Sequence, residues 1–211
     1  MKQLLDILAR ALSVVLYPLF IPTYGMVLFC YACSADHRIP AVWTIVALCG
    51  TLLLTCILPA TAIWSLIRKG KVSSMQIFNA RERTYPYLYT ALGFGFWAYL
   101  LIAVLHAPAY ISLVAVGATI AIGLVAVINH WWKISAHLTG LGGLLGGVLS
   151  FCLGCGIMPS WGMLSGWLAA TLVLMWARLY LNAHTSAQVA AGWLLGLSCT
   201  FFPYAIACYV S

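Results

Sequence analysis

The residues of this chain best suited to chemistry are a few histidines and arginines set among long apolar stretches. Arg178 and His184 lie close together near the C-terminal end, and Ser135 and His137 lie upstream of them. Imidazole can act as a nucleophile or move a proton near neutral pH, and guanidinium groups bind phosphoryl oxygens through paired donors. The combination predicts chemistry on an anion, for which phosphate is the commonest candidate.

A second group of basic side chains lies earlier in the chain, between residues 68 and 85, where it accompanies one acid, Glu82. Its members are Arg68, Lys69, Lys71, Arg81 and Arg83. For the first three, the tendency of cytoplasmic loops to collect positive charge is an adequate explanation. That tendency does not explain the histidines, nor Arg178.

The elements that must position these side chains are membrane helices. Of the 211 residues, 64% are hydrophobic and only 6% are charged, and the mean hydropathy is +1.05. A soluble domain carries roughly a quarter charged residues. Only helices satisfy their own backbone hydrogen bonds in lipid at a length of about 20 residues. We therefore predict an all-α, polytopic transmembrane bundle of about six to seven spanning helices, which forms one membrane domain over residues 1–211.

Hydropathy divides the chain into seven apolar segments. They cover residues 4–33, 41–67, 86–106, 110–131, 138–158, 161–181 and 184–209. The first is too long for the apolar region of a secretory signal and contains two prolines, so it predicts a retained, kinked helix. The fifth contains Gly142 and Gly146, and also Gly143 and Gly147, at the spacing that lets helix backbones approach closely.

The eight cysteines lie in or beside the apolar segments. In that setting a cysteine is usually a small buried hydrophobic residue, so we expect no disulfide framework. Cys152 and Cys155 have the spacing of a redox or zinc pair, but no second pair accompanies them and their surroundings are apolar.

Counting membrane crossings places three connections on one face, namely residues 68–85, 131–137 and 181–184. These connections carry most of the basic residues and histidines, whereas the opposite face has only Asp36, His37, Arg38 and His106. Polar residues that gather in a membrane bundle are usually functional. The count therefore predicts one basic site. The excess of Lys and Arg favours a cytoplasmic position for it, although the side of the membrane stays open.

These spacings resemble three motifs of the type 2 phosphatidic acid phosphatase and vanadium haloperoxidase superfamily. Ser135-Ala136-His137 is similar to the second motif, Pro-Ser-Gly-His, and residues 178–188 resemble the third, Arg-x5-His-x3-Asp. The first motif, Lys-x6-Arg-Pro, is matched loosely by residues 71–86. The resemblance covers residues 71–188 with the motifs in the right order, and it implies a small bacterial integral-membrane member.

The resemblance implies a lipid-phosphate phosphatase, or a phosphotransferase of the same chemistry, that works through a phosphohistidine without a metal or other cofactor. His184 would be the nucleophile and His137 the general acid. The phosphate-binding residues would be Arg178, Arg83, Arg81, Ser135 and Lys71. The expected partners are membrane lipids, among them a lipid phosphate substrate, and not nucleic acid. The expected location is a bacterial cell membrane, the inner one.

The largest departure from the family pattern is Gln188, which stands where the family has Asp. If His184 opens the last helix, the two residues stack one turn apart, and the amide oxygen can hold the histidine tautomer without bringing a negative charge. Ala136 replaces a glycine. The missing Arg-Pro pair leaves open whether Arg81 or Arg83 is the first-motif clamp.

Gln188 and the loose first motif also favour an alternative, a non-catalytic lipid-phosphate-binding or structural membrane protein with a decayed site. A metal-dependent enzyme is less well supported, because the predicted face lacks the acid or thiolate partners that zinc sites usually recruit. A transporter also stays open, although no charged residue lies plainly in the middle of a helix.

Overall fold

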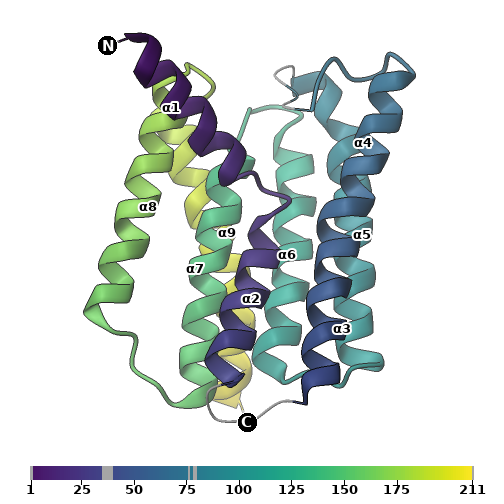
Figure 1. Ribbon diagram of the computed structural model, residues 1–211, viewed down its shortest axis with the longest axis vertical. Coiled ribbons are helices and arrows are strands. Elements are labelled where there is room, and N and C mark those ends of the chain that lie inside the picture. Colours follow the sequence, from purple (N-terminus) through teal and green to yellow (C-terminus); the bar gives the residue numbers. More distant parts are fainter. Residues whose placement is uncertain (1, 35–39, 76, 78–79, 211) are drawn as a thin grey trace.

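The computed structural model describes residues 2–34, 40–75, 77 and 80–210, and every regular element in these ranges is a helix (Figure 1). The α-helices are α1 (Lys2–Val15), α2 (Ile21–Ser34), α3 (Ala41–Thr51), α4 (Leu58–Arg68), α5 (Thr84–Ala103), α6 (Ala109–Ile128), α7 (Ala136–Cys155), α8 (Trp161–Tyr180) and α9 (Ser186–Val210). A π-helical turn, η1 (Leu52–Ile57), joins α3 to α4, and a 3-10 turn, η2 (Ala80–Arg83), precedes α5. The all-α prediction is confirmed.

Within the described ranges, six helical stretches are long and apolar enough to cross a membrane. The first is the continuous helix Ala41–Arg68, which includes η1, and the others are α5, α6, α7, α8 and α9. The protein is therefore a multi-pass membrane protein, at the lower end of the predicted number of spans.

The first apolar segment differs from the prediction, because it forms two helices and not one kinked helix. Pro18 lacks an N–H donor and disfavours the helical conformation at Tyr17, so α1 ends before it. Pro22 lies in the first turn of α2, where a missing N–H is harmless. α2 is a shorter apolar helix, and it runs from the middle of the bundle to the lower end in Figure 1.

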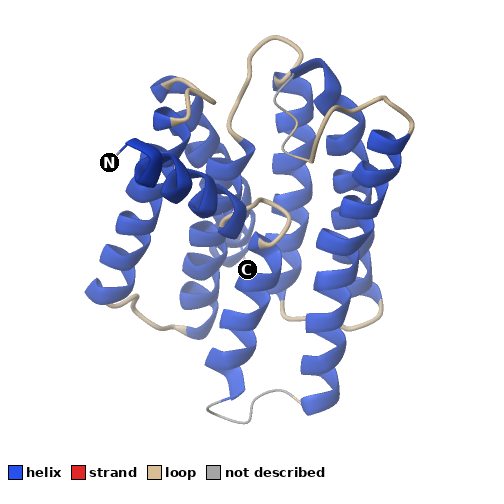
Figure 2. Ribbon diagram, turned by 45° about the horizontal axis from the view of Figure 1, so that its top comes forward, coloured by secondary structure: helices blue, strands red, loops and turns tan. Residues whose placement is uncertain are grey.

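α1 is too short to span a membrane and lies obliquely against α8 at the upper end of the bundle (Figures 1 and 2). One side of the helix is apolar and exposed. Its exposed apolar residues are Leu4, Ile7, Leu8, Val14 and Val15. Lys2 and Arg10 are exposed as well. This amphipathic pattern is typical of a helix that lies in the membrane interface.

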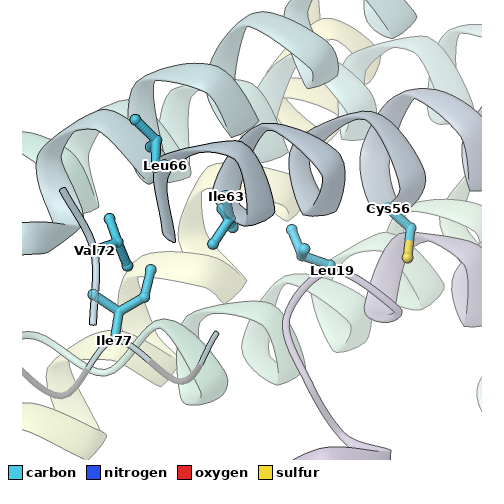
Figure 3. Close-up of a cluster of buried hydrophobic side chains, with 6 residues drawn as sticks. All are labelled: Leu19, Cys56, Ile63, Leu66, Val72 and Ile77. Carbon is cyan, nitrogen blue, oxygen red and sulfur yellow. The ribbon is translucent and has the colours of Figure 1, made fainter. Parts of the chain in front are cut away.

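The three connections predicted to share a face do lie at one end of the bundle, beside α1 (Figure 1). Their described residues are 69–75, 77, 80–83, 129–135 and 181–185. A buried cluster that consists of Leu19, Cys56, Ile63, Leu66, Val72 and Ile77 anchors the turn between α1 and α2 to α4 and to the first of these connections (Figure 3).

The closest helix packing joins α7 to α9 and depends on glycine. A methyl group on Gly146 of α7 would overlap the hydroxyl of Thr200, and one on Gly196 of α9 would overlap the carbonyl of Thr139. Gly142 likewise faces the backbone of α9. The predicted role of the glycines in close packing is confirmed, and the α7–α9 seam forms a rigid base beneath the site. All eight cysteines are free thiols.

Candidate functional site

A cavity of about 730 Å³ runs through the bundle, and four of the sequence-predicted site residues line it. Arg83 comes from η2, His137 from α7, Arg178 from α8, and His184 from the turn between α8 and α9. They thus belong to different elements that meet at one end of the molecule. Most of the other lining residues are apolar.

These four side chains are buried although all of them can carry positive charge. Arg83 is 6% exposed, Arg178 7%, His184 8% and His137 9%. Burying a charged group is unfavourable unless it is paired, and no acidic residue is found among the described residues that line the cavity. The buried positive charges therefore have no acidic partner among these lining residues, and the site suits an anion.

Local helix chemistry explains why Arg178 and His184 face the same cavity. α8 ends in a Schellman motif, in which Asn182 adopts a left-handed conformation with φ of 49°. The amide of Ala183 donates to the carbonyl of Arg178 at 3.1 Å, and the amide of Asn182 to that of Leu179 at 2.9 Å. The chain reverses sharply there, so the last turn of α8 and the residues just beyond it lie together.

The ring of His184 is held by the backbone. Its Nδ1 lies 3.0 Å from the carbonyl oxygen of Lys133. Because a carbonyl can only accept, Nδ1 must carry the proton, and Nε2 is left with a free lone pair. Burial and, to a smaller extent, the positive charge of Arg178 lower the pKa of His184 to about 4. The imidazole is therefore neutral at physiological pH, which is the form that a nucleophile needs.

The structure does not show the expected contact between Gln188 and His184, and the last helix begins just after His184. α9 begins at Ser186, with Thr185 as its N-cap, so His184 precedes the helix. Thr185 and Gln188 form a capping box: the Thr185 amide donates to Gln188 Oε1 at 3.1 Å, and the Gln188 amide donates to Thr185 Oγ1 at 3.4 Å. The side-chain oxygen of Gln188 thus caps α9. The carbonyl of Lys133, and not the Gln188 side chain, accepts the hydrogen bond from the His184 ring.

The guanidinium group of Arg178 has a hydrogen-bond partner at Nη1 but none at Nε. Its Nη1 donates to the hydroxyl of Ser13 on α1 at 3.1 Å. Its Nε is buried without a hydrogen-bond partner. An unpaired donor on a buried cation is expensive, and it marks a place where an acceptor can bind.

His137 also depends on α1. Its Nε2 lies 3.0 Å from the carbonyl oxygen of Ser13, so Nε2 carries the proton and Nδ1 has a free lone pair. The ring of Tyr17 packs edge-on against the His137 ring, with 5.6 Å between the centroids. Sequence reasoning missed both Ser13 and Tyr17. A backbone carbonyl leaves no signal in a sequence, and a single serine in an amphipathic helix leaves very little.

The remaining predicted phosphate ligands divide into those that reach the cavity and those that do not. Arg83 lines the cavity, with its Nε donating to the carbonyl of Ile77 at 2.8 Å. The side chain of Arg81 falls outside the part of the chain that the structure describes. Lys71 is exposed, with its ammonium group 5.8 Å from the centre of the Tyr85 ring, and it does not line the cavity.

Ser135 likewise has a structural position. It is fully buried and forms the N-cap of α7, where its hydroxyl accepts from the Leu138 amide at 3.5 Å. Its own amide donates to the carbonyl of Gln188 at 3.3 Å. The structure does not show the predicted use of the Ser135 amide or hydroxyl as a phosphate donor, because the amide joins α7 to α9, the hydroxyl caps α7, and Ser135 does not line the cavity.

The neighbouring Lys133 is half-buried, and burial lowers the pKa of its ammonium group, with further lowering from Arg83 and Arg178.

Among the described residues, no three His, Cys, Asp or Glu side chains are grouped so that they could hold a metal ion. Comparison of the chain with known families, curated proteins and solved structures gives no match.

Proposed function

We propose that this protein is a membrane lipid-phosphate phosphatase, or a phosphotransferase of the same chemistry, which acts through a phosphohistidine on His184 and without metal. One observation carries the proposal. Two buried arginines and two buried histidines line one end of a mainly apolar cavity, among described lining residues that include no acid, and Arg178 Nε has no partner there.

The phosphoryl group binds at the cationic end of the cavity. Arg178 donates through its unpaired Nε, and Arg83 supplies a second buried positive charge. Positioned donors of this kind stabilise the charge on the phosphoryl oxygens more strongly as the transition state forms, because they need no reorganisation. Guanidinium groups do this work where other phosphatases use metal ions.

The nucleophile is Nε2 of His184, which holds its lone pair free because Nδ1 is bonded to the Lys133 carbonyl. Nε2 forms a bond to phosphorus while the bond from phosphorus to the alcohol oxygen breaks, and that oxygen keeps the electron pair. His137, protonated at Nδ1, gives the oxygen its proton. A phosphate monoester with a second pKa of about 6 can bring this proton into the site.

Hydrolysis of the phosphohistidine completes the cycle. Water attacks phosphorus, Nδ1 of His137 takes the proton of the water, and the bond between phosphorus and Nε2 of His184 breaks. An alcohol in place of water gives phosphotransfer. The same two ring nitrogens therefore serve both halves of the reaction.

The apolar part of the cavity suits the tail of a lipid. Its lining continues from Tyr17 and His137 to Met158, in the connection between α7 and α8, and to Met163, near the start of α8. That connection lies at the other end of the bundle (Figure 1). A lipid monophosphate or diphosphate, such as phosphatidic acid, phosphatidylglycerol phosphate or a polyprenyl diphosphate, combines an anionic head with such a tail. The membrane in question is a bacterial cell membrane, the inner one.

The test is phosphate release by the purified, detergent-solubilised protein from a panel of lipid phosphates. We expect release that survives EDTA and is inhibited by vanadate, which resembles the five-coordinate phosphoryl group. Loss of activity on chelation, with recovery on addition of zinc or magnesium, would contradict the metal-free mechanism.

A second candidate function is binding of a lipid phosphate without catalysis. It is favoured by the neutral partner of His184, a backbone carbonyl instead of a carboxylate. Binding of vanadate or of a lipid phosphate, together with no release from any member of the panel, would favour this candidate over the enzyme.

A further inference from the structure

Ser13 contacts two residues of the site at once, from a helix that carries none of the three motifs. Its carbonyl oxygen lies 3.0 Å from Nε2 of His137, and its hydroxyl oxygen lies 3.1 Å from Nη1 of Arg178. Ser13 itself is 3% exposed. It is thus enclosed by the groups that it contacts.

The hydroxyl of Ser13 is oriented towards Arg178 by its own helix. It donates to the carbonyl of Ala9 at 2.9 Å, one turn back, so its lone pairs remain for the guanidinium group. Because Ser13 holds Nη1, the edge of the guanidinium formed by Nε and Nη2 is left for an oxyanion. That edge offers two parallel donors, and Nε on it has no protein partner.

The carbonyl of Ser13 determines which nitrogen of His137 handles the substrate proton. It accepts from Nε2–H, so Nδ1 is the nitrogen that gives and takes protons. The same carbonyl can keep accepting from Nε2–H when the ring becomes a cation. Tyr17, four residues along, packs edge-on against the ring and restricts its rotation.

We propose that Ser13 is a positioning residue of this site: its hydroxyl aims the free edge of Arg178 at the phosphoryl group, and its carbonyl sets the reactive nitrogen of His137. The inference rests on the proposed function. It assigns the N-terminal interfacial helix α1 a direct part in organising the site.

The first test compares vanadate binding and the KM for lipid phosphate in three variants of the full chain. Ser13→Ala removes the hydroxyl, and Ser13→Thr keeps it. The matched control is Ser150→Ala, since Ser150 is another fully buried helical serine, whose hydroxyl donates to the Thr200 carbonyl at 3.1 Å and which does not line the cavity.

We expect Ser13→Ala to weaken vanadate binding and raise KM by roughly tenfold, the loss typical of one hydrogen bond to a charged group. Ser13→Thr should restore both quantities, and Ser150→Ala should change neither, even if its thermal stability falls as much as that of Ser13→Ala. Equal vanadate affinity in Ser13→Ala and Ser150→Ala, with an active wild type, would overturn the inference. Failure of the proposed function would instead appear in the wild type.

The second test needs no turnover. Nitrogen-15 NMR of histidine-labelled protein, assigned with His137→Gln and His184→Gln, reports which ring nitrogen is protonated. We expect Nε2–H on His137 and Nδ1–H on His184, two opposite tautomers in one site. A proton on Nδ1 of neutral His137 would overturn the role of the Ser13 carbonyl.

Discussion

The α7–α9 seam and the N-terminal helix α1 hold the site in different ways. In the seam, glycines bring two backbones into contact, so the position of His137 is set by packing that leaves no room for a methyl group. α1 is held against α8, and it reaches the site through the polar groups of one residue, Ser13. His137 thus rests on a tightly packed pair of helices, while the orientation of His137 and Arg178 depends on a helix whose apolar side is exposed.

The largest expected effect separates the nucleophile from the positioning contacts that α1 makes. His184→Ala removes the proposed nucleophile, so turnover should fall by more than about a thousandfold. Ser13→Ala keeps the nucleophile and should retain measurable turnover. Phosphate release from the best lipid of the panel measures both, and appreciable activity in His184→Ala would show that the nucleophile is wrongly assigned.

The next largest effect tests the close packing between α7 and α9. Gly196→Ala places a methyl group against the Thr139 carbonyl across the seam, and we expect it to lower the free energy of unfolding by about 1–3 kcal/mol. Gly166→Ala on α8 is the matched control, because a methyl group there meets nothing within 4 Å. The control should be neutral or stabilising, by up to about 1 kcal/mol. Equal thermal stability of the two variants in detergent would argue against a tightly packed seam.

A third prediction concerns the protonation of His184. Burial and then Arg178 hold its pKa at about 4 in the folded protein, against 6.5 for a free histidine. The unfolded chain therefore takes up the proton first as the pH falls, so stability should decline from about pH 6.5 down to about pH 4, by an amount on the order of a few kcal/mol. NMR titration of His184 measures this pKa directly.

The same titration can separate the two causes of the lowered His184 pKa, burial and the charge of Arg178. Arg178→Gln should raise the pKa of His184 part of the way towards 6.5, because burial, the larger cause, remains. A wild-type midpoint close to 6.5 would mean that the histidine is not enclosed as described.

The smallest expected effect lies at Gln188. Since its side chain caps α9, Gln188→Glu should preserve the capping box and change turnover by less than about threefold. Gln188→Ala should lower the free energy of unfolding by about 1 kcal/mol, as expected for a lost cap. A tenfold rise in turnover in Gln188→Glu or Gln188→Asp would show that a carboxylate at this position reaches His184 after all.

The sequence could predict the membrane spans, because hydropathy depends on sequence alone. Counting the crossings could also predict that Arg83, His137, Arg178 and His184 converge at one end of the bundle. The hydrogen-bond partners could not. The backbone amide of Thr185 competes with the His184 ring for the side-chain oxygen of Gln188. Which of the two binds this oxygen depends on the residue at which α9 starts.

The partners of both site histidines are backbone carbonyls, those of Lys133 and Ser13. Every residue type carries such a carbonyl, so no spacing rule could have identified these two. The split of the first segment at Pro18 was predictable in kind, since proline breaks helices, but the sequence pattern did not distinguish a kink from a complete break.

The most direct test of the proposed phosphohistidine is to trap the phosphoryl group on the enzyme. The purified protein is mixed with a lipid phosphate that carries a labelled phosphoryl group, quenched in alkali, where a phosphohistidine survives, and digested for mass spectrometry. We expect an acid-labile phosphoryl group on His184 in the wild type and none in His184→Ala. Phosphate release with no labelled protein, or with the label on another residue, would contradict it.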